Sequence, residues 1–139
     1  MPHATNDYLL LLGIITCVCV PAITFFDDEN FKVLHGIIAS GAFLGGAFYA
    51  NALSKTMIAH RKLFDLATQT EIATASKLAV TINATLGSFL MSMTLYGSGY
   101  WSTSMFEWLL TFQIFNYFAL TSFTNSYYQT VHPYATLKK

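Results

Sequence analysis

Four long apolar stretches, separated by short polar connections, constrain this chain more than any other feature of its sequence. They lie at about residues 8–26, 31–54, 75–96 and 103–127. A helix needs about 20 mostly apolar residues to cross roughly 30 Å of hydrocarbon, and each stretch is about that long. In lipid a helix satisfies its own backbone groups, and the stretches lack the alternating polarity of membrane β-strands. The sequence therefore predicts an all-α fold, an integral membrane bundle of four transmembrane helices in one domain over residues 1–139.

The composition of the chain favours lipid as its surroundings. Hydrophobic residues make up 54% of the chain and charged residues only 10%, whereas soluble domains carry roughly 25% charged residues. A globule of this size needs a larger number of charged side chains to form a polar surface. The formal net charge of zero leaves no basic excess for phosphates. These values argue against a soluble enzyme, a disordered tail and a nucleic-acid partner. They indicate that the lipid bilayer is the main partner of the chain.

The distribution of basic residues predicts the orientation of the bundle. With four spans, both termini and the middle connection (residues 55–74) lie on one face. That face carries six of the seven basic residues, which are Lys55, Arg61, Lys62, Lys77, Lys138 and Lys139. By the positive-inside rule, we expect both termini to face the cytoplasm or the mitochondrial matrix.

The connections and the N-terminal segment complete the predicted topology. Pro21 is expected to kink the first helix or end its regular part. Residues 97–100 read Gly-Ser-Gly-Tyr, which is typical of a tight turn. The connection over residues 55–74 is expected to carry helical extensions rather than a domain. Residues 1–7 hold no Lys or Arg, so we expect the first stretch to be retained as a helix and not cleaved as a secretory signal.

His35 and Glu107 form the most informative polar pair in the predicted spans. Each lies about one turn inside its span from the same acidic face of the bundle. A carboxylate in lipid is costly and usually faces the bundle interior with a partner. We therefore expect the two side chains to hydrogen-bond or ion-pair as a structural polar clip between helices. A proton relay or a ligand site is the alternative interpretation of the same pair.

The other potential ligands do not form a metal or haem pattern. Cys17 and Cys19 lie about 200° apart around a helix, so they cannot share a metal ion or a disulfide. A membrane haem needs a histidine from each of two helices, and only His35 lies within a predicted span. No nucleophile, paired-carboxylate or phosphate-loop pattern is present. We expect no catalytic, cofactor-binding or metal site, and structural phospholipids are the only bound groups to consider.

Small and polar side chains in the spans predict where helices approach one another. Small residues lie on two faces of the second stretch, with Ala39, Ala42 and Gly46 on one face and Gly41 and Gly45, a GxxxG step, on the other. Small residues let helix backbones approach closely in lipid. This helix is therefore expected to pack on two sides, either within its own bundle or against both its bundle and a neighbouring protein.

Hydroxyl and amide groups form two further patterns. A single stripe in the third stretch is suited to interhelical hydrogen bonds, and its members are Thr81, Thr85, Ser88 and Ser92. Gln113 and Asn116 share a face of the fourth stretch and could contact another helix, a partner or lipid head groups. Lys77 can extend its long stem to the positive face. The glycosylation sequon at Asn83 lies inside a predicted span, so we interpret it as chance.

Two runs of residues resemble a known family. The first is Val33-Leu34-His35 with Ala39, Ala42-Phe43, Gly46, Tyr49 and Ser54; the second is Glu107-Trp108 with Phe112 and Tyr117-Phe118. They resemble the last four helices of the DRAM family, the damage-regulated autophagy modulators, over about residues 13–125. His35, Lys77 and Glu107 stand at matching positions, whereas Leu53 replaces the family's glutamine. The resemblance implies a non-enzymatic helical membrane protein linked to lipid organisation or autophagy.

Three functions are compatible with these features. The first is an accessory subunit of a multi-subunit membrane complex, with a mitochondrial respiratory complex or ATP synthase as the favoured setting. The second is a free-standing DRAM-like protein of endolysosomal or plasma membranes. A small transporter using His35 and Glu107 is the third, and the lack of an ionisable group near mid-membrane argues against it.

Overall fold

The computed structural model describes residues 3–26, 29–97 and 101–131, and these residues form helices and short connections without a strand. The elements are α1 (His3–Ala22), α2 (Lys32–Ala59), the 3-10 helix η1 (Arg61–Leu63), α3 (Leu66–Tyr96) and α4 (Trp101–Val131). The all-α prediction is confirmed for the described residues, with one helix for each apolar stretch.

The helix ends lie at residues whose side chains stop or cap a helix. α1 ends one residue after Pro21, at Ala22, so the proline marks the end of regular helix and the first helix stops short of residue 26. α2 continues past residue 54 to Ala59 and α3 begins at Leu66, so residues 55–74 are largely helical as predicted. Asp65 caps α3 by accepting a hydrogen bond from the Thr68 backbone N–H at 3.4 Å.

α3 ends at Tyr96 and is capped by Gly97, whose φ of 80° lies in the left-handed region that glycine adopts at least cost. The Gly97 N–H donates to the Met93 carbonyl at 3.0 Å and closes the last turn. The remainder of the predicted tight turn, residues 98–100, lies outside the described residues.

Two of the four helices are long and apolar enough to cross a membrane by length and composition. They are α2 and α3, and residues 7–22 of α1 form a shorter apolar helix. This finding, made on the described residues, gives two helices that could span a membrane and is coarser than the four spans that the sequence predicts.

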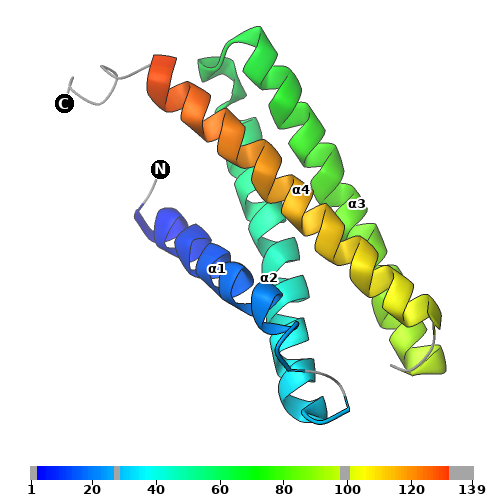
Figure 1. Ribbon diagram of the computed structural model, residues 1–139. Helices are drawn as coiled ribbons and strands as arrows, with labels where there is room; N and C mark the ends of the chain where they lie inside the picture. The colour runs from blue at the N-terminus through cyan, green and yellow to red at the C-terminus, as the bar shows by residue number, and fades with distance from the viewer. Residues whose placement is uncertain (1–2, 27–28, 98–100, 132–139) are drawn as a thin grey trace.

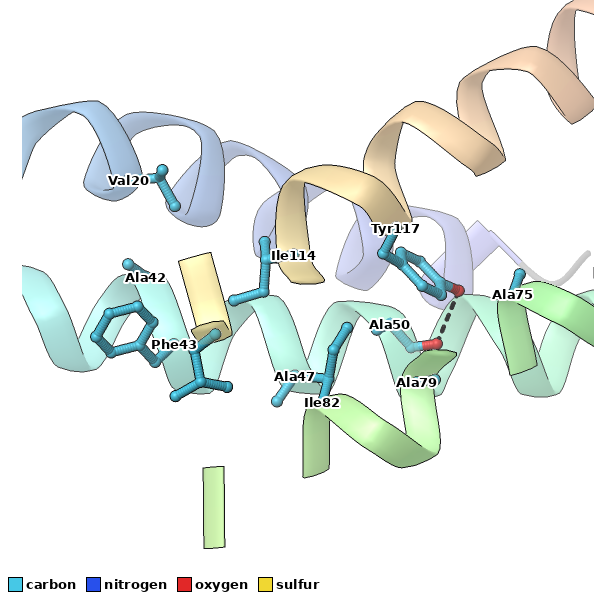
Figure 2. Packing of buried hydrophobic residues seen from close by; sticks show 11 residues of the cluster. Val20, Ala42, Phe43, Ala47, Ala50, Ala75, Ala79, Ile82, Ile114 and Tyr117 are labelled. Carbon is cyan, nitrogen blue, oxygen red and sulfur yellow. Dashed lines mark hydrogen bonds between the residues drawn. The ribbon is translucent and has the colours of Figure 1, made fainter. Parts of the chain in front are cut away.

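The helices run up and down, with α2 at the centre of the packing (Figure 1). The start of α1, the α2–α3 connection and the end of α4 lie at one end of the bundle. α2 packs against all three other helices and α3 packs against α4, whereas α1 rests mainly on α2. The core between them is a cluster of small and apolar side chains (Figure 2), comprising Val20, Ala42, Phe43, Ala47, Ala50, Ala75, Ala79, Ile82, Leu110, Ile114 and Tyr117.

Both small-residue faces of α2 are occupied within the chain. A Cβ atom added to Gly41 would lie 2.8 Å from Cys19 Sγ, and one added to Gly45 would lie 3.1 Å from Thr16 Oγ1, so this face packs closely on α1. A Cβ atom on Gly46 would lie 2.7 Å from Ile114 Cδ1 of α4. Ala42 on the same helix is fully buried and Ala39 packs against the core. Of the two alternatives, the structure therefore shows packing within the bundle on each face.

Candidate functional site

The predicted pair of His35 and Glu107 lies in contact at the end of the bundle where α2 and α4 begin. The distance from His35 Nε2 to Glu107 Oε1 is 3.7 Å, and the side chains are 19% and 30% exposed. This distance lies within the range of an ion pair and exceeds that of a good hydrogen bond. On the other side of the ring, His35 Nδ1 lies 2.5 Å from the carbonyl oxygen of Phe26.

These contacts determine which proton the imidazole of His35 carries. A carbonyl oxygen only accepts, so the Nδ1 atom must hold a hydrogen and donate it to Phe26. The Nε2 atom faces the Glu107 carboxyl group on the other side of the ring. His35 therefore connects the segment after α1, the start of α2 and the start of α4. This arrangement can hold three parts of the fold together.

A second polar contact joins α2 to α4 in the core. The Tyr117 hydroxyl donates to the Ala50 carbonyl at 2.9 Å, drawn as a dashed line in Figure 2. The Tyr117 oxygen also lies 2.7 Å from Ser54 Oγ, which therefore serves as the donor of that bond. Tyr117 is 1% exposed. Both of its hydrogen-bonding capacities are thus satisfied inside the bundle, as a buried hydroxyl requires.

A cluster of aromatic side chains lies next to this contact and extends to α1. The ring of Tyr49 stacks on Phe118 with a centroid distance of 4.9 Å and meets Tyr117 edge to face at 6.4 Å. A Cβ atom on Gly13 of α1 would lie 3.3 Å from Tyr49 Cε2. Three helices therefore meet at Tyr49, and glycine at position 13 lets α1 approach the ring.

A third polar contact joins α2 to α3 through two amides. Asn51 Nδ2 donates to Asn83 Oδ1 at 2.9 Å, and Asn83 Nδ2 donates to Asn51 Oδ1 at 2.8 Å. Asn83 Nδ2 also donates to the carbonyl of Ala79 at 2.9 Å. The asparagine of the glycosylation sequon thus takes part in helix pairing.

The predicted hydroxyl stripe of α3 divides into two parts. Ser92 is buried and lies 2.9 Å from Ser102 Oγ and 2.8 Å from Thr103 Oγ1 of α4, which is the predicted interhelical bonding. Thr85 is also buried. Thr81 and Ser88 are exposed and donate to carbonyls of their own helix, so they form no bond to another helix among the described residues. The four positions spread over about 60° around the helix, and the edge of the α3–α4 interface runs through that arc.

The other predicted contact residues occupy different environments. Gln113 is half-buried, and its Oε1 atom is buried without a hydrogen-bond partner in the described part of the chain. Asn116 is exposed and donates to the Phe112 carbonyl of its own helix at 2.8 Å. Lys77 is exposed on α3. No bond from either amide to another helix is seen among the described residues.

Within residues 3–26, 29–97 and 101–131, no group of three or more His, Cys, Asp or Glu side chains is placed to hold a metal ion. Cys17 and Cys19 are free thiols.

Sequence reasoning missed six of the residues that make polar contacts between helices, among them Ser102 and Thr103, the partners of Ser92. Asn51 and Asn83 gave no signal as contact residues, because a single amide in an apolar helix points to no particular partner; Ser54 entered only through the family resemblance. Tyr117 entered in the same way. The sequence does offer one signal, which is the position of each residue along the bundle axis. Because neighbouring helices alternate in direction, Asn51 and Asn83 lie at similar positions along that axis.

Comparison of the chain with known proteins finds no matching family model, no matching curated protein and no matching solved structure.

Proposed function

We propose that this protein is a non-catalytic accessory subunit of a multi-subunit membrane complex, and that it stabilises the assembly through helix and lipid packing. All four helices cross the bilayer, and both termini lie on the positive, cytoplasmic or matrix side. The favoured complex is a mitochondrial inner-membrane respiratory complex or ATP synthase. Its partners are then the bilayer and the membrane subunits around it.

One observation carries this proposal: interhelical polar bonds tie the bundle together, while α1 and one side of α4 expose large apolar side chains. The bonds of Tyr117, the Asn51–Asn83 pair and the hydroxyl of Ser92 all join two helices of this chain. Outward, α1 exposes 62% of Leu10 and of Val18. Water would make such a surface prone to association, whereas lipid makes it the ordinary surface of a spanning helix.

The outward side of α4 supports the same interpretation. A straight row of large apolar side chains recurs there at spacings of three and four residues, made up of Trp101, Met105, Trp108, Phe112 and Phe115. Their exposed fractions run from 48% to 75%. The row begins with a tryptophan, the residue type that anchors helices at the edge of a bilayer. Its apolar continuation gives α4 a side suited to acyl chains or to another subunit's helix.

Membrane extraction followed by native electrophoresis tests the proposal. A tagged chain should stay in membranes washed with alkaline carbonate. After mild detergent it should migrate in a species much larger than the 15.5 kDa chain, and a strong detergent should release the single chain as the internal control. Proteins that co-purify with the large species identify the complex. Release by carbonate, or migration of a lone chain in mild detergent, would refute the proposal.

A free-standing DRAM-like protein involved in lipid organisation or autophagy is the alternative. The observation that favours it is the contact of His35 with Glu107, because both residues stand at positions that match that family. Fluorescent tagging separates the two proposals: a mitochondrial pattern supports the subunit, and an endolysosomal or plasma-membrane pattern supports the alternative.

A further inference from the structure

The outward side of the α2–α3 contact carries hydrogen-bonding capacity that helix pairing leaves over. An asparagine amide has two N–H donors, and its oxygen accepts two bonds. Both Nδ2 hydrogens of Asn83 are engaged, by Asn51 and by the Ala79 carbonyl. Asn51 uses one N–H in the pair, which leaves its second N–H and one lone pair on each oxygen. These groups face outward in the proposed span, where an unmet donor is costly.

Positive charge lies close to this amide pair, toward the basic end of the bundle. Lys55 follows Asn51 by one helical turn on the same face of α2, a rise of about 6 Å. Lys77 precedes Asn83 on the antiparallel helix by a rise of about 9 Å toward the same end and lies about 120° around α3 from it, on the exposed side. Its ammonium group therefore reaches the site only through its long stem. Both lysines are exposed. No described carboxylate forms an ion pair with either of them, so both charges are available to a ligand.

The surface becomes apolar on the other side of the amide pair. Phe48, one turn before Asn51 on α2, is 54% exposed. Gly87, one turn after Asn83 on α3, has no heavy atom within 4 Å of where its Cβ would be. Packing inside the chain therefore does not require glycine at position 87. The missing side chain leaves open space on α3. This space lies at about the depth of Phe48, because both residues lie one turn beyond the amide pair toward the same end of the antiparallel helices.

We propose that this α2–α3 surface binds one anionic phospholipid. Its phosphate lies between the ammonium groups of Lys55 and Lys77, and its ester carbonyl accepts from the free N–H of Asn51. One acyl chain continues over Gly87 beside Phe48. The spacing suits the ligand: the polar layer on each side of a bilayer is about 5–8 Å thick, which matches the rise of about 6–9 Å from the lysines to the amides. The charge of the site is complementary to an anionic head group.

This inference rests on the membrane insertion proposed above and does not depend on partner subunits. Lipid binding to the purified, delipidated chain in mild detergent tests it by native mass spectrometry. Phosphatidylglycerol is titrated against phosphatidylcholine, with inorganic phosphate as a competitor. We expect at least about tenfold tighter binding of phosphatidylglycerol, with no displacement by millimolar phosphate. Equal binding of the two lipids would overturn the proposal, and displacement by phosphate would identify a free-phosphate site instead.

Variants locate the lipid on the chain. Lys55→Gln removes a charge at the site, whereas Lys32→Gln removes an exposed charge at the opposite end of the same helix. Loss of one charged hydrogen bond should weaken binding about tenfold in Lys55→Gln and leave Lys32→Gln unchanged. Asn51→Leu should weaken binding similarly. If that variant unfolds, the exposed Lys55→Gln still decides the question. Equal affinities of the two lysine variants would refute the location.

Two further measurements separate this inference from its competitors. In intact membranes, crosslinking of Gly87→Cys to another polypeptide instead of to lipid would show that a neighbouring helix occupies the surface, which contradicts the proposal. A chain that resists carbonate washing and yet binds no lipid refutes this inference alone. A chain released by carbonate refutes this inference and the proposed function together.

Discussion

The contact between Tyr117 and α2 allows a quantitative test of how this bundle is held together. Tyr117→Phe removes one hydroxyl and keeps the ring. The change deletes the bond to the Ala50 carbonyl at 2.9 Å and the bond from Ser54 at 2.7 Å. Interhelical hydrogen bonds in membrane bundles average about 0.6 kcal/mol and reach about 1.7 kcal/mol. Two bonds to a side chain that is 1% exposed should therefore contribute about 1–2 kcal/mol to the free energy of unfolding.

The two groups that Tyr117 contacts can find other hydrogen-bond partners, which limits the loss of stability. The Ala50 carbonyl keeps its helical backbone bond, and the Ser54 hydroxyl can turn to a carbonyl of its own helix, as the Thr56 hydroxyl does at 3.0 Å. Ser54→Ala should therefore destabilise by less than Tyr117→Phe, about 0.5–1 kcal/mol. The double variant should be about as stable as Tyr117→Phe alone, because both changes delete the same bond.

Unfolding in mixed micelles with a rising fraction of a denaturing detergent, followed by circular dichroism, measures these differences. Tyr8→Phe is the matched control, because Tyr8 is 48% exposed and its hydroxyl takes no part in the core. The control should match the unmodified chain. Equal stability of Tyr117→Phe and the control, or full additivity of its effect with that of Ser54→Ala, would show that the Tyr117 hydroxyl does not hold α4 to α2.

Two further predictions use the same assay and compare matched positions. Glu107→Gln removes the carboxylate from its contact with His35 at 3.7 Å and should lower the free energy of unfolding by up to about 1 kcal/mol, since the pair is partly exposed. The control Glu29→Gln, at an exposed position of the same end, should have no effect. Equal effects of the two changes would contradict a stabilising role for the pair. Gly46→Ala and Gly87→Ala gain the same helix propensity, but only the first places a Cβ 2.7 Å from Ile114 Cδ1. Gly46→Ala should therefore be less stable than Gly87→Ala by about 1–3 kcal/mol. Equal stabilities would show that α2 and α4 do not pack as closely as the structure indicates.

Helix number and approximate helix ends could be read from the sequence, because both depend on neighbouring residues. Long apolar runs exclude other backbone forms in lipid, and Pro21, Asp65 and Gly97 act within one turn of their own positions. The contact between His35 and Glu107 was also predictable. Both residues lie about one turn from the same end of the bundle. Because the helices alternate in direction, this places them at the same position along the bundle axis, however each helix is rotated.

Tertiary structure alone decided how each helix is rotated about its axis. A helix that is apolar all round has no polar side to mark the outside, so its sequence does not separate inward from outward residues. Tyr117 and Trp108 are both aromatic residues of α4, yet the first is 1% exposed and the second 75%. The same ambiguity concealed the Asn51–Asn83 pair and split the hydroxyl stripe of α3. Pairing between helices depends on contacts with distant parts of the chain, and one-dimensional periodicity carries no information about those contacts.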